Sequence, residues 1–282
     1  MIGQIFKQLR KSKHLTLSAV AHDIISISQL SRWENGTVDI PLNIFLALLA
    51  RINVSPREFL SMTAIEDGRN NSFFNQLAIL YRQKQSDKVY QLFLENIASY
   101  HRNNNVDHLF QAAATANIFY DLTKKNCFSA KDKAALVSAL TSSEHWNLQT
   151  IRALGNSVFI LPVELVFDLS NKLLNDLNYL HNLNFELYLD AWVTIINSDL
   201  ILIIKNFGLA QKLFKNIKKI ALPPLLSSIK IRISFLELLI EYRVNHDSHA
   251  LQSFLDALEL IGMADLKDDL LSEWALIDDT LI

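Results

Sequence analysis

The chain has 282 residues, of which half are hydrophobic and a fifth are charged, and this composition fits a folded protein with a large core in one or two domains. Only six glycines and five prolines are present, so turns are scarce and long helices are favoured over a β-rich fold. The formal net charge of −2 gives no sign, for the molecule as a whole, of a nucleic-acid partner.

The charge is unevenly distributed between the two ends of the chain. The basic residues within the first 35 positions are Lys7, Arg10, Lys11, Lys13 and Arg32, against only Asp23 and Glu34. The last stretch carries one lysine, Lys267, against the acidic residues Asp265, Asp268, Asp269, Glu273, Asp278 and Asp279. A basic head and an acidic tail predict different partners at the two ends.

The cysteine count and the apolar segments indicate in which cellular compartment the protein is expected. A single cysteine, Cys127, excludes an intramolecular disulfide and fits a reducing environment. No apolar run follows Met1, so no secretory signal is expected. The most apolar segment, 195–204, is too short to span a bilayer and predicts a buried helix. We therefore expect a cytoplasmic protein without a membrane partner.

Residues 2–60 predict five short helices. Ile2, Ile5 and Leu9 repeat at helical spacing and predict the inward face of the first helix. The starts of the four later helices are predicted from capping residues and a first-turn proline, at Thr16, Ser26, Pro41 and Ser55.

The second and third of these helices, separated by residues 23–26, have the spacing of a helix-turn-helix. The third helix is predicted to end at Asn35-Gly36, where glycine supplies a left-handed cap. Leu30 and Trp33 form its inner face, and its outer face carries the polar residues Ser28, Gln29 and Arg32. Polar side chains that point outward from a helix can read base edges in a major groove. The alternative is a bare helical bundle whose basic face is only solvated.

The run ISQLSRWENG at 27–36 resembles the Cro/repressor-like helix-turn-helix family, and the resemblance covers residues 2–60. It implies a structural pair between Arg10 and Glu34. It also implies base contacts from the start of the third helix and one turn later, and phosphate contacts near its end and from the first helix. The DNA-binding residues so predicted are Ile27, Ser28, Gln29, Arg32, Asn35, Thr37 and Lys7. Ile27 is apolar, so it either touches a thymine methyl group or packs inward.

The polar run 66–72 predicts a linker between a DNA-binding domain at 1–65 and a sensor and dimerisation domain at 73–282. Short breaks between successive apolar stripes favour antiparallel helix hairpins stacked into a TPR-like α-solenoid, so the expected fold class is all-α. The predicted helices span 73–83, 86–102, 106–123, 130–141, 145–158, 162–180, 184–204, 207–219, 223–245, 249–261 and 264–279.

Two asparagines lie within apolar helical stretches, Asn156 after Leu154-Gly155 and Asn197 after Ile195-Ile196. An amide buried among apolar side chains is costly unless its hydrogen bonds are satisfied. A neighbouring helix backbone can satisfy them, and so can the backbone of a peptide bound on the concave face of a solenoid. Both interpretations remain open at this point.

Nearly the whole chain resembles the Rgg (GadR/MutR) family of Gram-positive regulators. Beyond the head, the resemblance is carried by EHW at 144–146, LGNS at 154–157, IN at 196–197, LP at 222–223 and RISFL at 232–236. It implies a homodimer on a palindromic operator in double-stranded DNA, and a short hydrophobic signalling peptide on the concave face. Related receptors often have a basic residue where this chain has Ser157, so either another arginine takes a peptide carboxylate or the ligand differs. The peptide-binding residues so implied are Asn156, Asn197, Tyr188, Asp190, and either Arg152 or Arg232.

Other chemistry is not indicated. Six scattered glycines form no phosphate-binding loop, and the histidines lack the spacing of a metal site, so no cofactor, metal or catalytic residue is expected. The main hypothesis is a peptide-gated, sequence-specific DNA-binding transcription regulator that is not an enzyme. The alternatives are a non-enzymatic helical-repeat adaptor that binds a protein partner, and an enzyme with a DNA-binding head.

Overall fold

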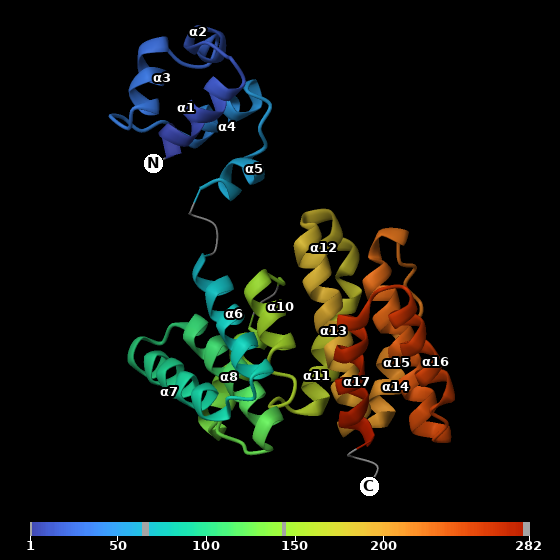
Figure 1. Cartoon of the computed structure of the whole chain (residues 1–282). Coiled ribbons are helices and arrows are strands. Elements are labelled where there is room, and N and C mark those ends of the chain that lie inside the picture. The colour runs from blue at the N-terminus through green and yellow to red at the C-terminus, as the bar shows by residue number, and fades with distance from the viewer. Residues whose placement is uncertain (1, 64–67, 143–144, 279–282) are drawn as a thin grey trace. The chain divides into compact units, whose positions relative to one another are not determined.

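The computed structural model describes residues 2–63, 68–142 and 145–278, and the elements within these ranges are helices (Figure 1). The predicted all-α fold is therefore confirmed. The chain divides into two compact units, Met1–Ala78 and Ile79–Ile282. Some residues of the sequence-based predictions lie outside the described ranges: Glu66 and Asp67 of the linker, Glu144 of the segment 144–146, and Asp279 of the acidic tail.

The first unit contains the five helices predicted for the head. They are α1 (Ile2–Ser12), α2 (Leu17–Ala21), α3 (Ile27–Glu34), α4 (Leu42–Arg51) and α5 (Pro56–Ser61). Ser26 Oγ accepts a hydrogen bond from the Gln29 N–H at 3.2 Å and so caps α3, whose end is followed by Gly36 at φ 74°. At α5, Ser55 and Glu58 form a reciprocal capping box. Side-chain capping therefore sets these two helix starts, as the sequence indicates.

The inward face of α1 agrees only in part with the predicted one, since Ile5 and Leu9 pack against the core of the unit but other residues are more deeply buried. Its buried residues are Gly3, Phe6 and Arg10, while Ile2 is 39% exposed. A Cβ atom on Gly3 would lie 2.1 Å from the backbone oxygen of Trp33, so α1 and α3 approach more closely than any other residue would allow. The apolar repeat could not predict the burial of Gly3 and Arg10, because neither a glycine nor a charged arginine counts as an apolar side chain.

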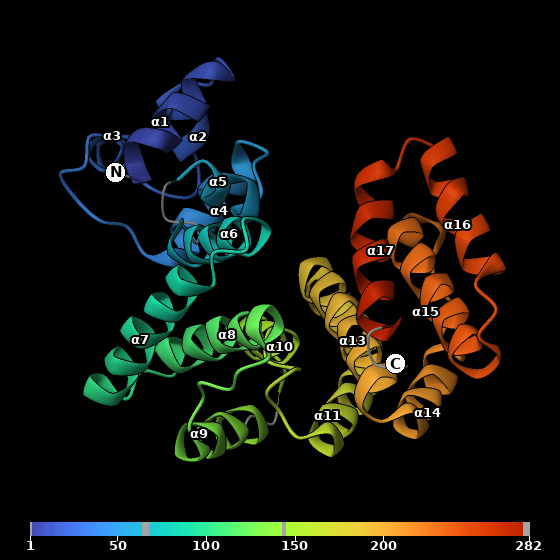
Figure 2. The ribbon, with the colours of Figure 1, turned by 60° about the horizontal axis from the view of Figure 1, so that its bottom comes forward.

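The second unit is a succession of packed helices (Figure 2). Helix α6 (Gly68–Arg82) runs across the division between the units. The other elements are α7 (Ser86–Asn103), α8 (Val106–Thr123), α9 (Ala130–Thr141), α10 (Leu148–Gly155), α11 (Val163–Asn175), α12 (Leu177–Leu183), α13 (Phe185–Lys205), α14 (Phe207–Ile217), the 3-10 turn η1 (Pro224–Leu226), α15 (Ser227–Asn245), α16 (His249–Leu260) and α17 (Ala264–Asp278). Short connections, such as the one between α7 and α8, join helices that pack on each other.

Several predicted helices have different bounds, and the one predicted over 223–245 begins as the 3-10 turn η1 and is α-helical only from Ser227. Helix α6 begins at Gly68 instead of 73, so residues 68–72 are helical. The helix predicted over 145–158 is only Leu148–Gly155. The Asn147 side chain caps its start, and at its end the side chains of Asn156 and Ser157 donate hydrogen bonds to the carbonyls of Arg152 and Ala153. The helix predicted over 162–180 breaks at Asp176, whose N–H is shared between the carbonyls of Lys172 and Leu173 at 3.2 Å each, which tightens the turn.

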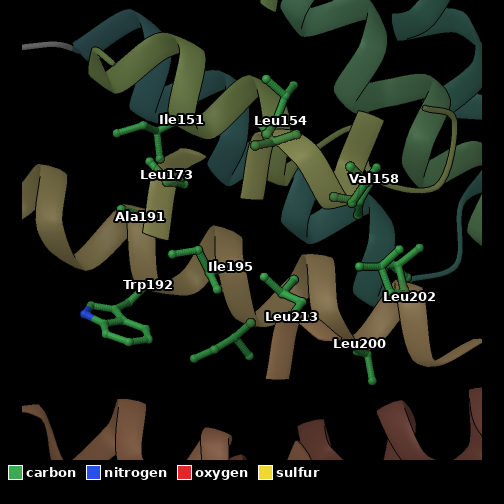
Figure 3. Packing of buried hydrophobic residues seen from close by; sticks show 14 of the residues in the cluster. Ile151, Leu154, Val158, Leu173, Ala191, Trp192, Ile195, Leu200, Leu202 and Leu213 are labelled. Atoms are coloured by element: carbon green, nitrogen blue, oxygen red, sulfur yellow. The ribbon is translucent and has the colours of Figure 1, made fainter. Parts of the chain in front are cut away.

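The core of the second unit is built around α13, which packs against α10, α11, α12, α14, α15 and α17. In Figure 3, Ile151 of α10 points toward Leu173 of α11 and Ala191 of α13. Within the described residues, α13 is the one helix long and apolar enough to cross a membrane. Its apolar side chains are mostly buried inside the protein, so it is a core helix. The prediction of a buried helix over 195–204 is confirmed.

Helix α13 contains a buried carboxyl group, that of Asp199. The residue is 0% exposed, and neither carboxyl oxygen has a hydrogen-bond partner among the described residues. Burial in apolar surroundings raises the pKa of Asp199 well above its ordinary value. Burial therefore favours the neutral carboxyl group in the folded protein, whereas the same group ionises in the unfolded chain above about pH 4.

We expect this difference to make stability fall as pH rises. Between the ordinary pKa and the raised pKa of the folded state, the unfolded chain releases a proton that the folded chain keeps, so the contribution of Asp199 declines by about 1.36 kcal/mol per pH unit. Asp199→Asn cannot ionise and should lose this slope, as measured by urea unfolding between about pH 4 and 7. Asp168→Asn, on the exposed side of α11, is the control. Parallel pH profiles for wild type and Asp199→Asn would contradict the assignment.

Candidate functional site

A buried ion pair fixes the position of α3. The guanidinium of Arg10 donates from Nε to Glu34 Oε1 at 2.6 Å and from Nη2 to Glu34 Oε2 at 2.7 Å. Its third bond, from Nη1, goes to the carbonyl of Leu15 at 2.7 Å. Both side chains are nearly inaccessible, and the hydrogen bonds to Glu34 raise the pKa of Arg10. The predicted pair is confirmed, and it ties α1 to the end of α3.

The outer face of α3 is open to solvent, as the sequence predicts. Ser28, Gln29 and Arg32 are exposed, whereas Leu30 and Trp33 are buried on the opposite side. Ile27 is 50% exposed, so of its two possible orientations the outward one is found. A rigid helix therefore presents a hydroxyl, an amide, a guanidinium and one apolar side chain on a single face.

The residues predicted to contact phosphates lie around the end of α3. Lys7 Nζ of α1 donates to Asn35 Oδ1 at 2.7 Å, which brings the lysine from the first helix to the C-terminal end of the third. Thr37 Oγ1 donates to the carbonyl of Arg32 at 2.8 Å. The structure thus places Lys7, Asn35, Thr37 and Arg32 in one neighbourhood. Lysine and amide groups of this kind suit contacts with phosphate oxygens.

A second cluster lies where α10 crosses α13. A Cβ atom on Gly155 would lie 2.7 Å from Thr194 Oγ1, and that hydroxyl donates to the carbonyl of Ile151 at 3.2 Å. The absence of a side chain on Gly155 therefore allows the two helices to approach closely. Sequence reasoning missed the roles of Gly155 and Thr194, although a glycine in the last turn of an apolar helix is a signal of close packing.

This close approach brings Arg152 beside the acidic residues of α13. Arg152 Nε donates to Asp190 Oδ2 at 2.7 Å, and Arg152 Nη2 lies 3.3 Å from Glu186 Oε1. The three side chains are partly exposed. Glu186 is a further member of the cluster that the sequence did not indicate.

Of the two asparagines singled out from the sequence, Asn156 caps the end of α10 and Asn197 lies within α13. Asn156 is half-buried, and its Nδ2 donates to the carbonyl of Arg152 at 2.8 Å, so one of its amide hydrogens is satisfied by its own helix. Asn197 is also half-buried and has no hydrogen-bond partner among the described residues. An unpaired, partly desolvated amide is a group that a polar ligand would stabilise.

The residue beside Asn156 lies in the core of the unit. Ser157 is fully buried and donates to the carbonyl of Ala153 at 2.6 Å. A basic side chain at this position could not reach the surface without disturbing that packing. Arg152 lies one helical turn before Asn156, and its guanidinium is directed to Asp190 and Glu186 on α13.

Two other predicted residues are placed differently. Tyr188 is only 6% exposed, with its ring 4.8 Å from that of His181 and 6.3 Å from that of Trp192, measured between centroids. Arg232 of α15 pairs with Glu273 at 3.1 Å and Asp269 at 3.5 Å, both on α17. The structure therefore brings Arg152, Asn156 and Asp190 together, while Arg232 is engaged by the acidic tail.

Possible metal ligands and the single thiol were also located in the structure. No group of three or more histidine, cysteine, aspartate or glutamate side chains that could hold a metal ion occurs among them. Burial raises the pKa of the Cys127 thiol to about 11, so the thiol form dominates at neutral pH.

Two sequence models of known families match the chain. Residues 6–59 match a helix-turn-helix model, and residues 90–271 match the model described as the C-terminal domain of the HTH-type transcriptional regulator Rgg. The resemblance stated from the sequence is thereby confirmed.

Solved structures share the fold over nearly the whole length. The SHP pheromone receptor Rgg2 of Streptococcus dysgalactiae is 19% identical, with a TM-score of 0.74 over 97% of this chain and 98% of that one. The PrgX/cCF10 complex contains a chain that is 14% identical, with a TM-score of 0.74 over 98% of this chain and 99% of that one. Since the Rgg model alone covers more than half of the sequence, and a helix-turn-helix precedes it, the chain belongs to the Rgg family of DNA-binding transcription regulators.

Proposed function

We propose that this regulator is gated by a short hydrophobic peptide, which binds where α10 crosses α13. The observation that carries the proposal is the half-buried amide of Asn197, which lacks a hydrogen-bond partner among the described residues. The amide of Asn156 retains a free acceptor oxygen on the neighbouring helix. A side-chain amide can donate to a backbone carbonyl and accept from a backbone N–H, which suits an extended peptide of any sequence.

The charged residues of the cluster add a second element of recognition. In the proposal, the carboxylate of a peptide takes the place of Asp190 or Glu186 on the guanidinium of Arg152. Arginine and carboxylate form paired, charge-assisted hydrogen bonds, so the exchange keeps the guanidinium satisfied. Before the peptide binds, Asp190 holds the guanidinium of Arg152 in position.

The named relatives support the class of ligand. Rgg2 of Streptococcus dysgalactiae is described as a pheromone receptor, and PrgX has been solved with cCF10 and with iCF10. A related solved structure is described as a bacterial peptide pheromone/receptor complex. These proteins share the fold of this chain, so a peptide is the ligand class we favour.

The proposed organisation is a cytoplasmic homodimer. In it, residues 1–65 bind a palindromic operator, residues 66–72 act as the linker, and residues 73–282 hold the peptide and dimerise. A peptide that binds one arrangement of the sensor more tightly than another shifts the population toward it, and the linker passes that bias to the DNA-binding heads.

The test combines peptide selection with calorimetry. Short apolar synthetic peptides that bind the wild-type chain are first isolated by affinity selection. The double variant Asn156→Ala/Asn197→Ala is then expected to bind the selected peptide about 30-fold more weakly, since each lost hydrogen bond costs about 1 kcal/mol. Basal binding to duplex DNA should be unchanged.

Asn178→Ala on α12 is the matched control, because it removes an exposed amide outside the cluster. Wild-type peptide affinity in the double variant would show that the ligand surface lies elsewhere.

A further inference from the structure

The second unit contains a cavity of about 250 Å³ whose lining residues are different from those of the α10–α13 cluster. It lies where the ends of α8 and α13 meet α9 and the segment that follows α10. The residues that line it are Tyr120, Asn126, Lys133, Phe159, Ile160, Leu161, Pro162 and Lys205.

Two lysines face this cavity, and among its described lining residues there is no carboxylate. Burial, together with repulsion from Lys133, lowers the pKa of Lys205. Asp121, the chain neighbour of Tyr120, is already engaged by Lys124 Nζ at 3.1 Å and by the hydroxyl of Tyr81 at 2.8 Å. Two ammonium groups that line one pocket, with no carboxylate among its described lining residues, repel each other, and a bound anion would relieve that repulsion.

The side chain of Lys205 is held in place by its surroundings. Its Nζ lies 5.6 Å from the ring centroid of Tyr120 and 5.7 Å from that of Phe159, and it also donates to the Phe159 carbonyl. An ammonium group has three N–H donors, so the bond to that carbonyl leaves others for a ligand. The position of the charge is therefore set before any ligand arrives.

The walls of the cavity also have a defined character. The rings of Tyr120 and Phe159 lie with centroids 6.1 Å apart and planes inclined by 38°. Ile160, Leu161 and Pro162 add apolar surface. The backbone N–H of Phe159 donates to Asn117 Oδ1 at 2.8 Å, which anchors this segment to α8. The cavity thus combines a cationic end with a mostly apolar, aromatic wall.

We propose that this cavity binds a small organic anion, whose carboxylate or phosphate accepts hydrogen bonds from Lys133 and Lys205 and whose flat apolar part lies against Tyr120 and Phe159. Sites for drug-sized ligands usually measure about 300–1,000 Å³, so the volume of this one suits a compact metabolite and excludes a whole peptide. The proposal does not depend on peptide gating. It makes the chain a receptor with a second, chemically different ligand site.

The test uses phenyl phosphate and inorganic phosphate as probes in calorimetric titrations of the full chain. Phenyl phosphate should bind the wild type at one site and more tightly than inorganic phosphate. Lys133→Gln should weaken its binding about tenfold or more, because a charge-assisted hydrogen bond is lost. Lys131→Gln is the matched control, since it removes an exposed lysine two residues earlier on the same helix. It should bind as the wild type does.

Lys133 is only partly buried, so the Lys133→Gln variant should keep its fold, which an unchanged unfolding curve verifies. Lys205→Gln is the second variant and should show the same loss. Absence of phenyl phosphate binding to the wild type would overturn the proposal, and so would equal affinity in the wild type and Lys133→Gln. Equal affinity for the two probes would overturn the role assigned to the aromatic wall.

Discussion

Glu34→Ala is expected to destabilise the helix-turn-helix unit by about 3–5 kcal/mol, because it leaves the guanidinium of Arg10 buried and unpaired. Arg10 and Glu34 are 6% and 1% exposed, so water cannot replace the lost partner. Domains are stable by only about 5–15 kcal/mol, and the change would remove much of that margin. Hydrogen exchange of the α3 amides in the full chain measures the effect on this unit alone.

Two further variants distinguish the effect of breaking the ion pair from the effect of removing an acidic residue elsewhere in the same unit. Asp39→Ala removes an exposed carboxylate from the same unit and should change stability by less than about 0.5 kcal/mol. Arg10→Met/Glu34→Leu removes both charges and should recover most of the loss, since an apolar pair of similar size is often as stable as a buried ion pair. Wild-type protection of the α3 amides in Glu34→Ala would contradict the role assigned to the pair.

Arg32→Ala is expected to weaken binding to a selected DNA duplex by about 1–3 kcal/mol, which is the usual worth of a good arginine contact to a base. Arg32 is exposed on the outer face of α3, while the neighbouring Trp33 is buried on the opposite side. Fluorescence anisotropy with a duplex selected from a random-sequence pool provides the measurement. Arg82→Ala removes an exposed arginine from α6 and is the charge-matched control. Equal affinities of Arg32→Ala and the control would exclude Arg32 from the interface.

Local signals in the sequence predict much of the fold. Ser26 and Ser55 cap the helices that they were expected to start, because capping depends only on residues three positions apart. The inner face of α1 is different, since it is decided by contact with α3. Gly3 and Arg10 are buried there because Trp33 and Glu34 lie opposite them, and a count of apolar residues cannot detect that.

In the candidate ligand site, too, some features follow from local sequence and others depend on contacts between helices. Asn156 and Asn197 could be singled out because an amide within an apolar helix is conspicuous by itself. The partners of the arginines depend on helix packing instead. Arg152 meets Asp190 because Gly155 lets α10 approach α13, and Arg232 of α15 meets Glu273 of α17 because both helices pack on α13. Long-range pairs of this kind are absent from any local pattern, so the acidic partners of Arg152 and Arg232 could not be predicted from the sequence.

The central claim is that the outer face of α3 and the neighbouring Lys7 bind duplex DNA, and a salt titration of duplex binding by the wild-type chain tests it most directly. Each phosphate contact contributes about −0.9 to the slope of log affinity against log salt concentration. With several such contacts around the end of α3, a slope of about −3 or steeper is predicted, and Arg32→Ala should bind more weakly at every salt concentration. Absent or salt-insensitive duplex binding would contradict the claim and favour an adaptor that binds a protein partner.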